Sequence, residues 1–183
     1  MPRVFYILLL IAIGYATWSH WPKPTVDWQT NQTASSHKAR LTELQKYDGE
    51  FRILGRKDYS SGTEAEFSPV DFAVGWGDMA KPEIYSQIDI SQSNRWYHWR
   101  IDHQPPISLA DIASHSANMH IIPANAQVAD ALKRIKEDDL VYLQGALVEV
   151  EMESGWRWRS SLSRDDTGAG ACELMRVDQV RVL

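Results

Sequence analysis

The chain contains a single cysteine, Cys172, among 183 residues. One thiol excludes an internal disulfide and any cysteine-rich zinc site, and we expect neither a metal nor a cofactor. Positive charge is also scarce, because 19 Lys and Arg stand against 24 Asp and Glu, for a net charge of −5. General binding to nucleic acid requires an overall basic surface, so no nucleic-acid partner is expected.

Charge is missing altogether from one stretch near the start, which runs from Val4 to Trp18 (VFYILLLIAIGYATW) and follows Arg3. About 15 residues is short for a membrane-spanning helix, which usually needs roughly 17 to 25. Trp18 and Trp21 would lie at the far interface as an aromatic belt and extend the span. The stretch therefore predicts a membrane anchor over residues 1–21.

The same stretch has a second interpretation as a cleaved signal peptide, because Gly14 and Ala16 place small residues where a signal peptidase reads them. Under both interpretations the remainder of the chain is exported. We expect a single-pass protein of the bacterial inner membrane with its C-terminal domain in the periplasm, or a secreted protein if cleavage occurs near Ala16.

The rest of the chain has the composition of a linker followed by one globular domain. Residues 22–46 are rich in polar residues and proline, and a short helix is expected over residues 37–47, with Leu41 and Leu44 on one side. Residues 47–183 form the expected extracytoplasmic domain. Hydrophobic residues make up 44% of the chain, including eight Trp, which excludes global disorder.

The best-marked sheet signal is a pair of strands over residues 138–173 with a turn at Ser154-Gly155. After the turn the residues alternate, which places the two tryptophans (Trp156 and Trp158) on one face and the two arginines (Arg157 and Arg159) on the other. In the first strand the apolar parity changes at Gly145, where we expect a bulge or sharp bend. Bent strands are typical of a small barrel, and a bulged meander is the alternative.

The remaining patterns predict helices inserted between strands. A helix is expected to begin at Ser68, and another, capped by Asn125, to span residues 125–135. Strands are expected over residues 84–91, 95–101 and 171–182. In the second of these, Tyr97, Trp99 and Ile101 share one face, and Trp96, His98 and Arg100 share the other.

This element order predicts an α+β fold with a mostly antiparallel, barrel-like sheet, either OB-like or sortase-like. A half-open sheet with a helix on one face fits the same order.

The segment from Ser114 to Pro123 is the most suggestive for chemistry. Read as a strand, it places Ala117, Met119 and Ile121 toward the core and Ser116, Asn118 and His120 on the opposite face. Histidine transfers protons near neutral pH, and an asparagine can orient it. The alternative is a hydrogen-bonded ladder beside a buried histidine. Since His115 has the other parity, a two-histidine metal site is not expected.

Cys172 follows a Gly-rich loop and begins a strand, where a thiol can be a nucleophile if a histidine lies nearby. An N-terminal anchor, then His120, then Cys172 and Arg176 resembles the layout of sortases. The resemblance implies His120 as acid/base, Cys172 as nucleophile and Arg176 as stabiliser of the oxyanion. Sortases have a Thr before the Cys, where this chain has Ala171. On one continuous strand, Arg176 would also lie roughly 13 Å from Cys172.

Four arginines, Arg157, Arg159, Arg164 and Arg176, are candidates for a local cationic patch that would take an anionic ligand or an acidic partner. Solvated strand faces are the alternative. The predicted binding residues are Ser116, Asn118, His98, Arg100, Arg157 and Arg159.

The segments SQSNRWYHWR, SHSANMHIIPA, GALVEV and WRWRSSLSR resemble a group of uncharacterised bacterial membrane-anchored proteins over roughly residues 66–176. This resemblance implies no activity. We therefore expect a membrane-anchored binding or assembly module that contacts an envelope protein or an anionic ligand through Asn118, His120 and the arginine-bearing hairpin edge. The alternative is a thiol-dependent hydrolase or transpeptidase with Cys172 as nucleophile and His120 as acid/base.

Overall fold

The computed structural model describes residues 26–27, 32–33, 39–163 and 172–183. The expected anchor (residues 1–21) and the loop that carries Arg164 lie outside these residues. Within the described part of the chain, none of the helices combines the length and the apolar character that crossing a bilayer requires.

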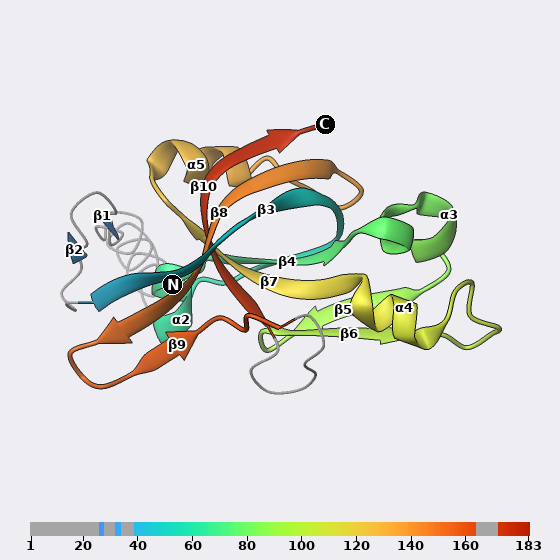
Figure 1. The fold of residues 1–183 in the computed structure, drawn as a ribbon, viewed down its shortest axis with the longest axis horizontal. Coiled ribbons are helices and arrows are strands. Elements are labelled where there is room, and N and C mark those ends of the chain that lie inside the picture. Colours follow the sequence, from blue (N-terminus) through green and yellow to red (C-terminus); the bar gives the residue numbers. More distant parts are fainter. Residues whose placement is uncertain (1–25, 28–31, 34–38, 164–171) are drawn as a thin grey trace, which may run out of the picture.

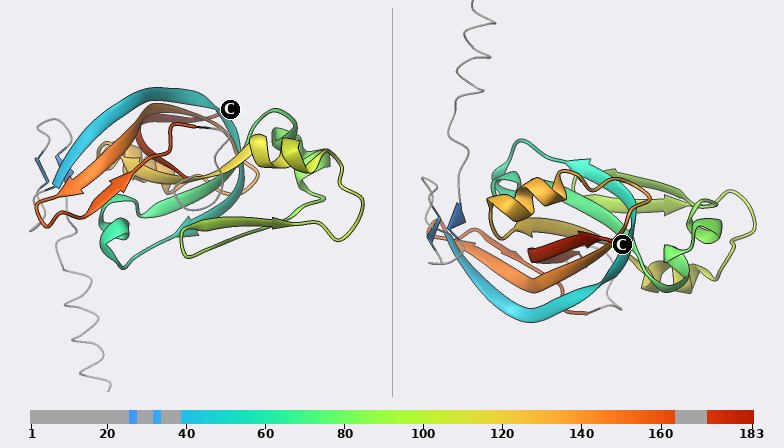
Figure 2. Two further views of the ribbon diagram at one scale, coloured as in Figure 1. Left: turned by 60° about the horizontal axis from the view of Figure 1, so that its bottom comes forward. Right: turned by 90° about the horizontal axis from the view of Figure 1, so that it is seen from above.

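The fold is α+β and rich in strands, as predicted. Its main sheet has six strands in the order β10-β7-β4-β3-β8-β9, and β10 also pairs with β8 (Figures 1 and 2). The sheet is ring-like but does not close completely. All neighbours are antiparallel except β10 and β7, which are parallel. The strands are β3 (Ala39–Asp58), β4 (Val70–Gly75), β7 (Ser116–Pro123), β8 (Leu140–Met152), β9 (Arg157–Arg159) and β10 (Glu173–Val182).

The long strand β3 gives the sheet its curvature. It pairs with β8 from Ala39 to Arg52 and with β4 from Arg52 to Asp58. The helix predicted over residues 37–47 is therefore wrong, since residues 39–47 are extended. Leu41 packs against apolar side chains of β8, and tertiary pairing here overrides the local pattern.

Gly145 lies at a close approach of two strands. A Cβ at this position would lie 1.9 Å from the carbonyl oxygen of Arg176. The register shifts occur in the neighbouring strands, between Glu43 and Gln45 in β3 and between Val177 and Gln179 in β10. The expected irregularity is thus present near Gly145, but the bulges belong to its partners. In β8 itself, both faces are buried beyond this glycine.

The interior of the ring holds the largest apolar cluster, which includes Phe72, Met119 and Leu143. Helix α5 (Ala126–Leu132) packs against β7 and β10 and adds to this cluster. Its predicted cap is confirmed, because the Asn125 side chain accepts a hydrogen bond from Val128 N at 3.0 Å.

A second, two-stranded sheet lies beside the ring and consists of β5 (Asp89–Ser93) and β6 (Trp96–Arg100). Their predicted pairing is confirmed, although residues 82–85 form the short helix α3 (Pro82–Tyr85) rather than the start of a strand. The expected faces are also confirmed. Tyr97, Trp99 and Ile101 pack over an apolar cluster that includes Ala73 of β4 and Met79.

The helix predicted to begin at Ser68 is wrong. The short helix α2 (Thr63–Phe67) ends at Phe67 with Ser68 as its C-cap, and β4 begins at Val70. Val70 and Phe72 are buried inside the ring, so their alternation marks a strand. Other short elements are β1 (Val26–Asp27), β2 (Gln32–Thr33), η1 (Gly77–Ala80) and α4 (Leu109–Ser114).

We expect Gly145→Ala to lower the free energy of unfolding by about 3 kcal/mol or more, because the new methyl group would clash with the backbone of Arg176 in the paired strand β10. Gly155 is the matched control. Its φ is +87°, and no heavy atom would lie within 4 Å of an added Cβ. Gly155→Ala should therefore cost only about 1 kcal/mol for the left-handed backbone. Urea unfolding followed by tryptophan fluorescence measures both, and equal losses would contradict the close approach at Gly145.

Candidate functional site

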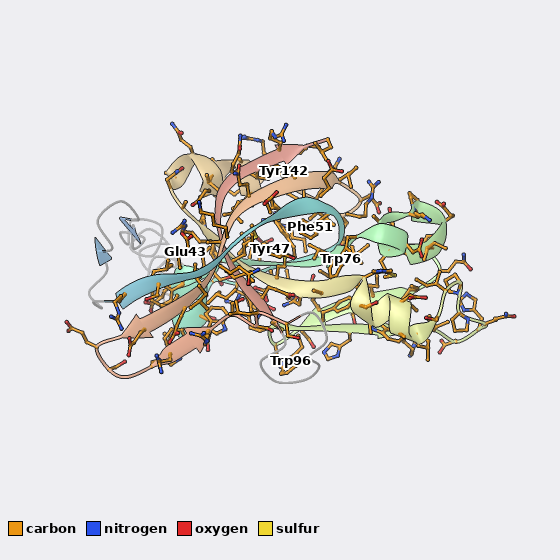
Figure 3. All side chains as sticks on the ribbon, in the orientation of Figure 1. Glu43, Tyr47, Phe51, Trp76, Trp96 and Tyr142 are labelled. Carbon is orange, nitrogen blue, oxygen red and sulfur yellow. The ribbon has the colours of Figure 1, made fainter. Side chains whose placement is uncertain are left out.

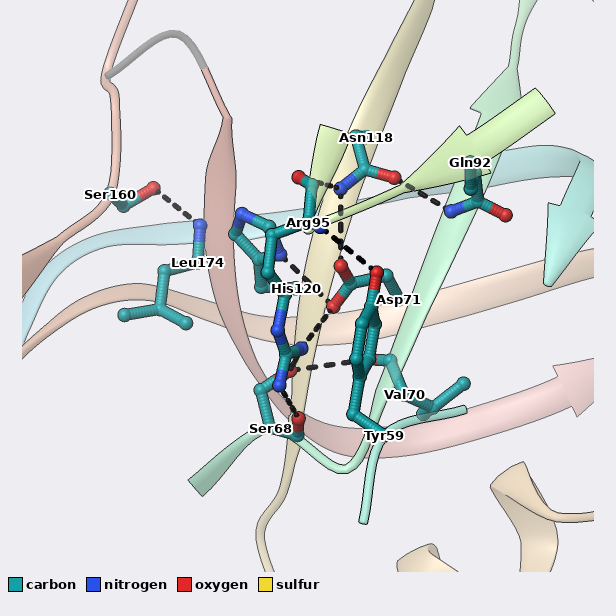
Figure 4. A network of polar contacts seen from close by, with 10 residues as sticks. All are labelled: Tyr59, Ser68, Val70, Asp71, Gln92, Arg95, Asn118, His120, Ser160 and Leu174. Atoms are coloured by element: carbon teal, nitrogen blue, oxygen red, sulfur yellow. Dashed lines mark hydrogen bonds and ion pairs between the residues drawn. The ribbon is translucent and has the colours of Figure 1, made fainter. Parts of the chain in front are cut away.

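Asp71 is the centre of a buried polar network that joins the β5–β6 hairpin to the outer face of the ring (Figure 4). It is the second residue of β4 and lies between Val70 and Phe72, whose side chains enter the ring, so its own side chain points outward. The residue is 0% exposed. A buried carboxylate is tolerated only if charged or hydrogen-bonding groups surround it, and the network supplies both.

Arg95 supplies the positive charge from the tip of the hairpin. Its Nη1 donates to Asp71 Oδ1 at 2.6 Å, and its Nη2 donates to the Ser68 carbonyl oxygen at 2.9 Å. The guanidinium carbon lies 3.6 Å from the centre of the Tyr59 ring. Asn94 and Arg95 form the turn with φ of 50° and 69°, a conformation that favours glycine or asparagine. The buried contacts of Arg95 compensate for its place in this turn.

Asn118 of β7 connects the hairpin backbone to the same carboxylate. Its Nδ2 donates to the Arg95 carbonyl oxygen at 3.1 Å and lies 3.4 Å from Asp71 Oδ2. Its Oδ1 accepts a hydrogen bond from Gln92 Nε2 at 2.7 Å. The predicted binding residue Asn118 is thus engaged by its own chain.

His120 faces Asp71 across the β4–β7 ladder, and its Nδ1 lies 3.0 Å from Asp71 Oδ1. Only 4% of the residue is exposed, and its ring lies 4.8 Å from that of Trp158. Asp71 Oδ1 is therefore shared by Arg95 and His120. We name Asp71, Arg95, Asn118 and His120, with Tyr59 and Ser68, the Asp71 network.

The tyrosines of this region keep their protons at neutral pH. Burial raises the pKa of Tyr59, and the nearby Asp71 carboxylate adds to the rise, although a backbone hydrogen bond from Arg95 opposes it. Burial also raises the pKa of Tyr97 to about 12. Tyr97 can therefore donate its hydroxyl proton to Ser116 Oγ, 3.1 Å away. Ser116 in turn donates to the Ile112 carbonyl oxygen, so this predicted binding residue also joins elements of the fold.

The other predicted residues of the hairpin, His98 and Arg100, are exposed and share a face of β6 with Trp96. Trp96, labelled in Figure 3, is 40% exposed. Arg100 Nη2 lies 3.1 Å from Asp89 Oδ2, and both side chains are mostly exposed. These three residues form an accessible row of aromatic, imidazole and guanidinium groups, which we name the hairpin row.

Arg157 and Arg159 of β9 share one face, as predicted, and both pair with Glu149 of β8. Arg176 does not join them, because it pairs with Asp178 at 2.8 Å and with Glu43 at 3.3 Å. The predicted cationic patch is therefore limited, among the described residues, to the β8–β9 hairpin.

Cys172 directly precedes β10 and is half-buried. Because β10 lies parallel to β7 with Leu174 opposite His120, the two predicted catalytic residues come from neighbouring strands. The backbone oxygen of Cys172 accepts a hydrogen bond from Ser161 N at 3.1 Å. Arg176, the third member that the sortase layout implies, is directed to carboxylates elsewhere.

Sequence reasoning missed Asp71 and Arg95, the two residues that carry the charge of the network. The signal for Asp71 was a single acidic residue within the apolar run Val70–Val74. The preceding Ser-Pro favoured a helix start, so this run was not interpreted as a buried strand. Arg95 follows Ser93-Asn94, which reads as an ordinary turn. Nothing local distinguishes a turn arginine that becomes buried from one that stays in solvent.

No family model, curated protein or solved structure among those compared with the chain matches it. Within the described residues, no group of three or more His, Cys, Asp or Glu side chains is arranged to hold a metal ion.

We expect Arg95→Met to lower the free energy of unfolding by about 3 kcal/mol or more, because it leaves the Asp71 carboxylate buried without its cation. Adding Asp71→Asn should recover part of this loss, since the amide carries no charge. Urea unfolding of both single variants and the double variant gives the coupling energy. The control is Arg100→Met, whose exposed pair should contribute less than about 1 kcal/mol. Strictly additive losses for Asp71 and Arg95 would contradict this account.

Proposed function

We propose that the chain is a membrane-anchored, extracytoplasmic binding module built on an OB-type sheet. Numbered along the chain, strands β3, β4, β7, β8 and β10 pair in the ring order 1-2-3-5-4-1. The third and fifth are parallel, and α5 lies between the third and fourth. This arrangement is typical of the OB fold, a partly open five-stranded barrel.

The Asp71 network is the observation that carries the proposal. OB folds bind ligands on the face of their second and third strands, which here are β4 and β7. In this chain that face carries the β5–β6 hairpin, held there by Arg95, and the polar groups beneath it are occupied. The groups of this face that are available for binding are therefore the exposed side chains of the hairpin row. A surface held rigidly before binding loses less entropy when a partner docks.

Residues 1–21 supply the proposed anchor and hold the domain at the outer surface of the inner membrane. The partners proposed are envelope proteins or anionic ligands. The proposed contact surface consists of the hairpin row and the β8–β9 hairpin. The β5–β6 and β8–β9 hairpins approach each other where the Arg95 guanidinium lies 5.6 Å from the Trp158 ring.

We expect a photo-crosslinking amino acid in place of His98 in the full-length chain to give adducts in intact cells, because the hairpin row is exposed. The same amino acid at Lys133, beside α5, is the matched exposed control and should give far fewer. The adducts should fractionate with membranes, and a chain that starts at residue 22 should lose them. Equal adduct yields at both positions, or no adducts at His98, would contradict the proposal.

A thiol-dependent hydrolase or transpeptidase is the second candidate, and the short distance between Asp71 and His120 favours it. A thiol is activated by a histidine that a carboxylate orients, and in this candidate the 3.0 Å between His120 Nδ1 and Asp71 Oδ1 gives Asp71 that role, although the pair lacks hydrogen-bond geometry in the structure. In this reading Cys172 is the nucleophile, His120 its acid/base, and Asp71 the orienting residue. Nδ1 faces Asp71 on β4, so the second ring nitrogen points away from β4, toward the β10 side (Figure 4).

Alkylation of Cys172 by iodoacetamide across the pH range separates the two candidates. An activated thiol reacts with an apparent pKa clearly below about 8.5, and His120→Asn returns the profile to that of an ordinary thiol. The binding proposal predicts the same profile, or no labelling, in both proteins. Retained far-ultraviolet circular dichroism is the control for the fold of the variant.

A further inference from the structure

Strand β9 is the strand of the six-stranded sheet that has a single neighbour. The pairings of the ring give each of the other five strands at least two partners, whereas β9 pairs only with β8 among the described residues. Figure 1 shows β9 beside the end of β8, where these strands extend away from the ring. An edge strand of this kind presents backbone groups that can pair with a further strand.

The hydrogen bonds to β8 show which backbone groups face outward. Met152 N donates to the Trp156 carbonyl oxygen at 2.9 Å, and Ser160 N donates to the Val148 carbonyl oxygen at 3.0 Å. Backbone groups of alternate residues in a strand point to opposite sides, so residues 156, 158 and 160 face β8. The N–H and C=O groups of Arg157 and Arg159 therefore form the outward edge.

The side chains on the two faces of β9 differ in character. Trp158 and the adjoining Trp156 pack into the outer apolar cluster, where Trp156 stacks on Phe67 with ring centres 5.8 Å apart. The opposite face carries Arg157 and Arg159, whose side chains are 62% and 54% exposed. The tryptophans hold the edge in place, and the arginines pair with Glu149 while more than half of each side chain stays exposed to a partner.

The charges around this edge indicate what can pair with it. Arg157, Arg159 and the adjacent Arg40 face Glu149 and Glu151, so three positive charges meet two negative charges and the cluster carries +1. In a two-fold pairing of two copies of β9, arginines would face arginines, and like charges directly opposite each other are destabilising. A second copy of the chain is therefore disfavoured, and a segment with carboxylates is favoured.

We infer that the outward edge of β9 takes an extended segment of a partner protein, added as a further strand, with acidic side chains at alternate positions. This inference rests on the proposed function and names the partner's chemistry. Backbone pairing with Arg157 and Arg159 provides the attachment. The carboxylates opposite the two guanidinium groups set the register, because a slip by one residue would carry them to the tryptophan face.

The test uses the full-length chain in nanodiscs and a blocked peptide of sequence Glu-Val-Glu-Val-Glu. We expect the peptide to shift the backbone amide resonances of Arg157 and Arg159, and the combined change Arg157→Gln and Arg159→Gln to weaken binding about tenfold or more. Arg181→Gln, on β10, is the charge control and should leave the affinity unchanged. A Lys-Val-Lys-Val-Lys peptide should not bind.

A second variant isolates the backbone. Arg159→Pro removes an outward N–H while leaving the hydrogen bonds to β8 intact, so it should weaken binding more than Arg159→Gln does. The inference is overturned if the peptide does not bind, if it binds all variants equally, or if β9 instead pairs with a second copy in sedimentation experiments. If one of these results overturns the inference but the β9 variants still give adducts at His98, the proposed function stands and only this inference fails.

Discussion

A carboxylate that no water reaches constrains the whole outer face of this domain. Asp71 lies within a strand whose neighbours in sequence fill the ring, so it cannot turn away without breaking the core. Its negative charge must be compensated at this buried position, and the Arg95 guanidinium compensates it. Because removing one partner of such a pair leaves an uncompensated buried charge, the two residues depend on each other for the fold.

The position of the β5–β6 hairpin follows from that pair. Among the residues that the structure describes, the hairpin is a separate sheet with no backbone ladder to the ring, so side chains hold it in place. Apolar packing of Tyr97 and Trp99 stabilises the contact of the hairpin with the ring but does not fix its orientation. The hydrogen bonds of Arg95 and Asn118 fix its turn above β4 and β7. The outcome is a ring-like sheet whose outer face over β4 and β7 is covered by an inserted hairpin, with the accessible groups on the insert and on β9.

Local patterns predicted the parts of the fold that local physics decides. The Asn125 cap and its apolar stripe defined a helix, and alternation assigned the faces of β6, β7 and β9, because one side of each strand meets an apolar cluster. Non-local pairing decided the rest. Residues 39–47 are extended because β8 lies beside them, and Val70 to Gly75 are extended because β3 and β7 do. Of the candidate site, His120 and Asn118 were predicted to share a face, but their burial depends on a turn arginine some 25 residues away in sequence, a relation that periodicity does not carry.

Hydrogen–deuterium exchange of the unmodified protein tests most directly whether the Asp71 network fixes the hairpin to the ring. If it does, the amides that pair β5 with β6 should exchange on the same timescale as those that pair β4 with β7, since both would open together. If the hairpin amides exchanged orders of magnitude faster while the ring stayed protected, the hairpin would be opening by itself, and the account of a rigidly displayed surface would be contradicted.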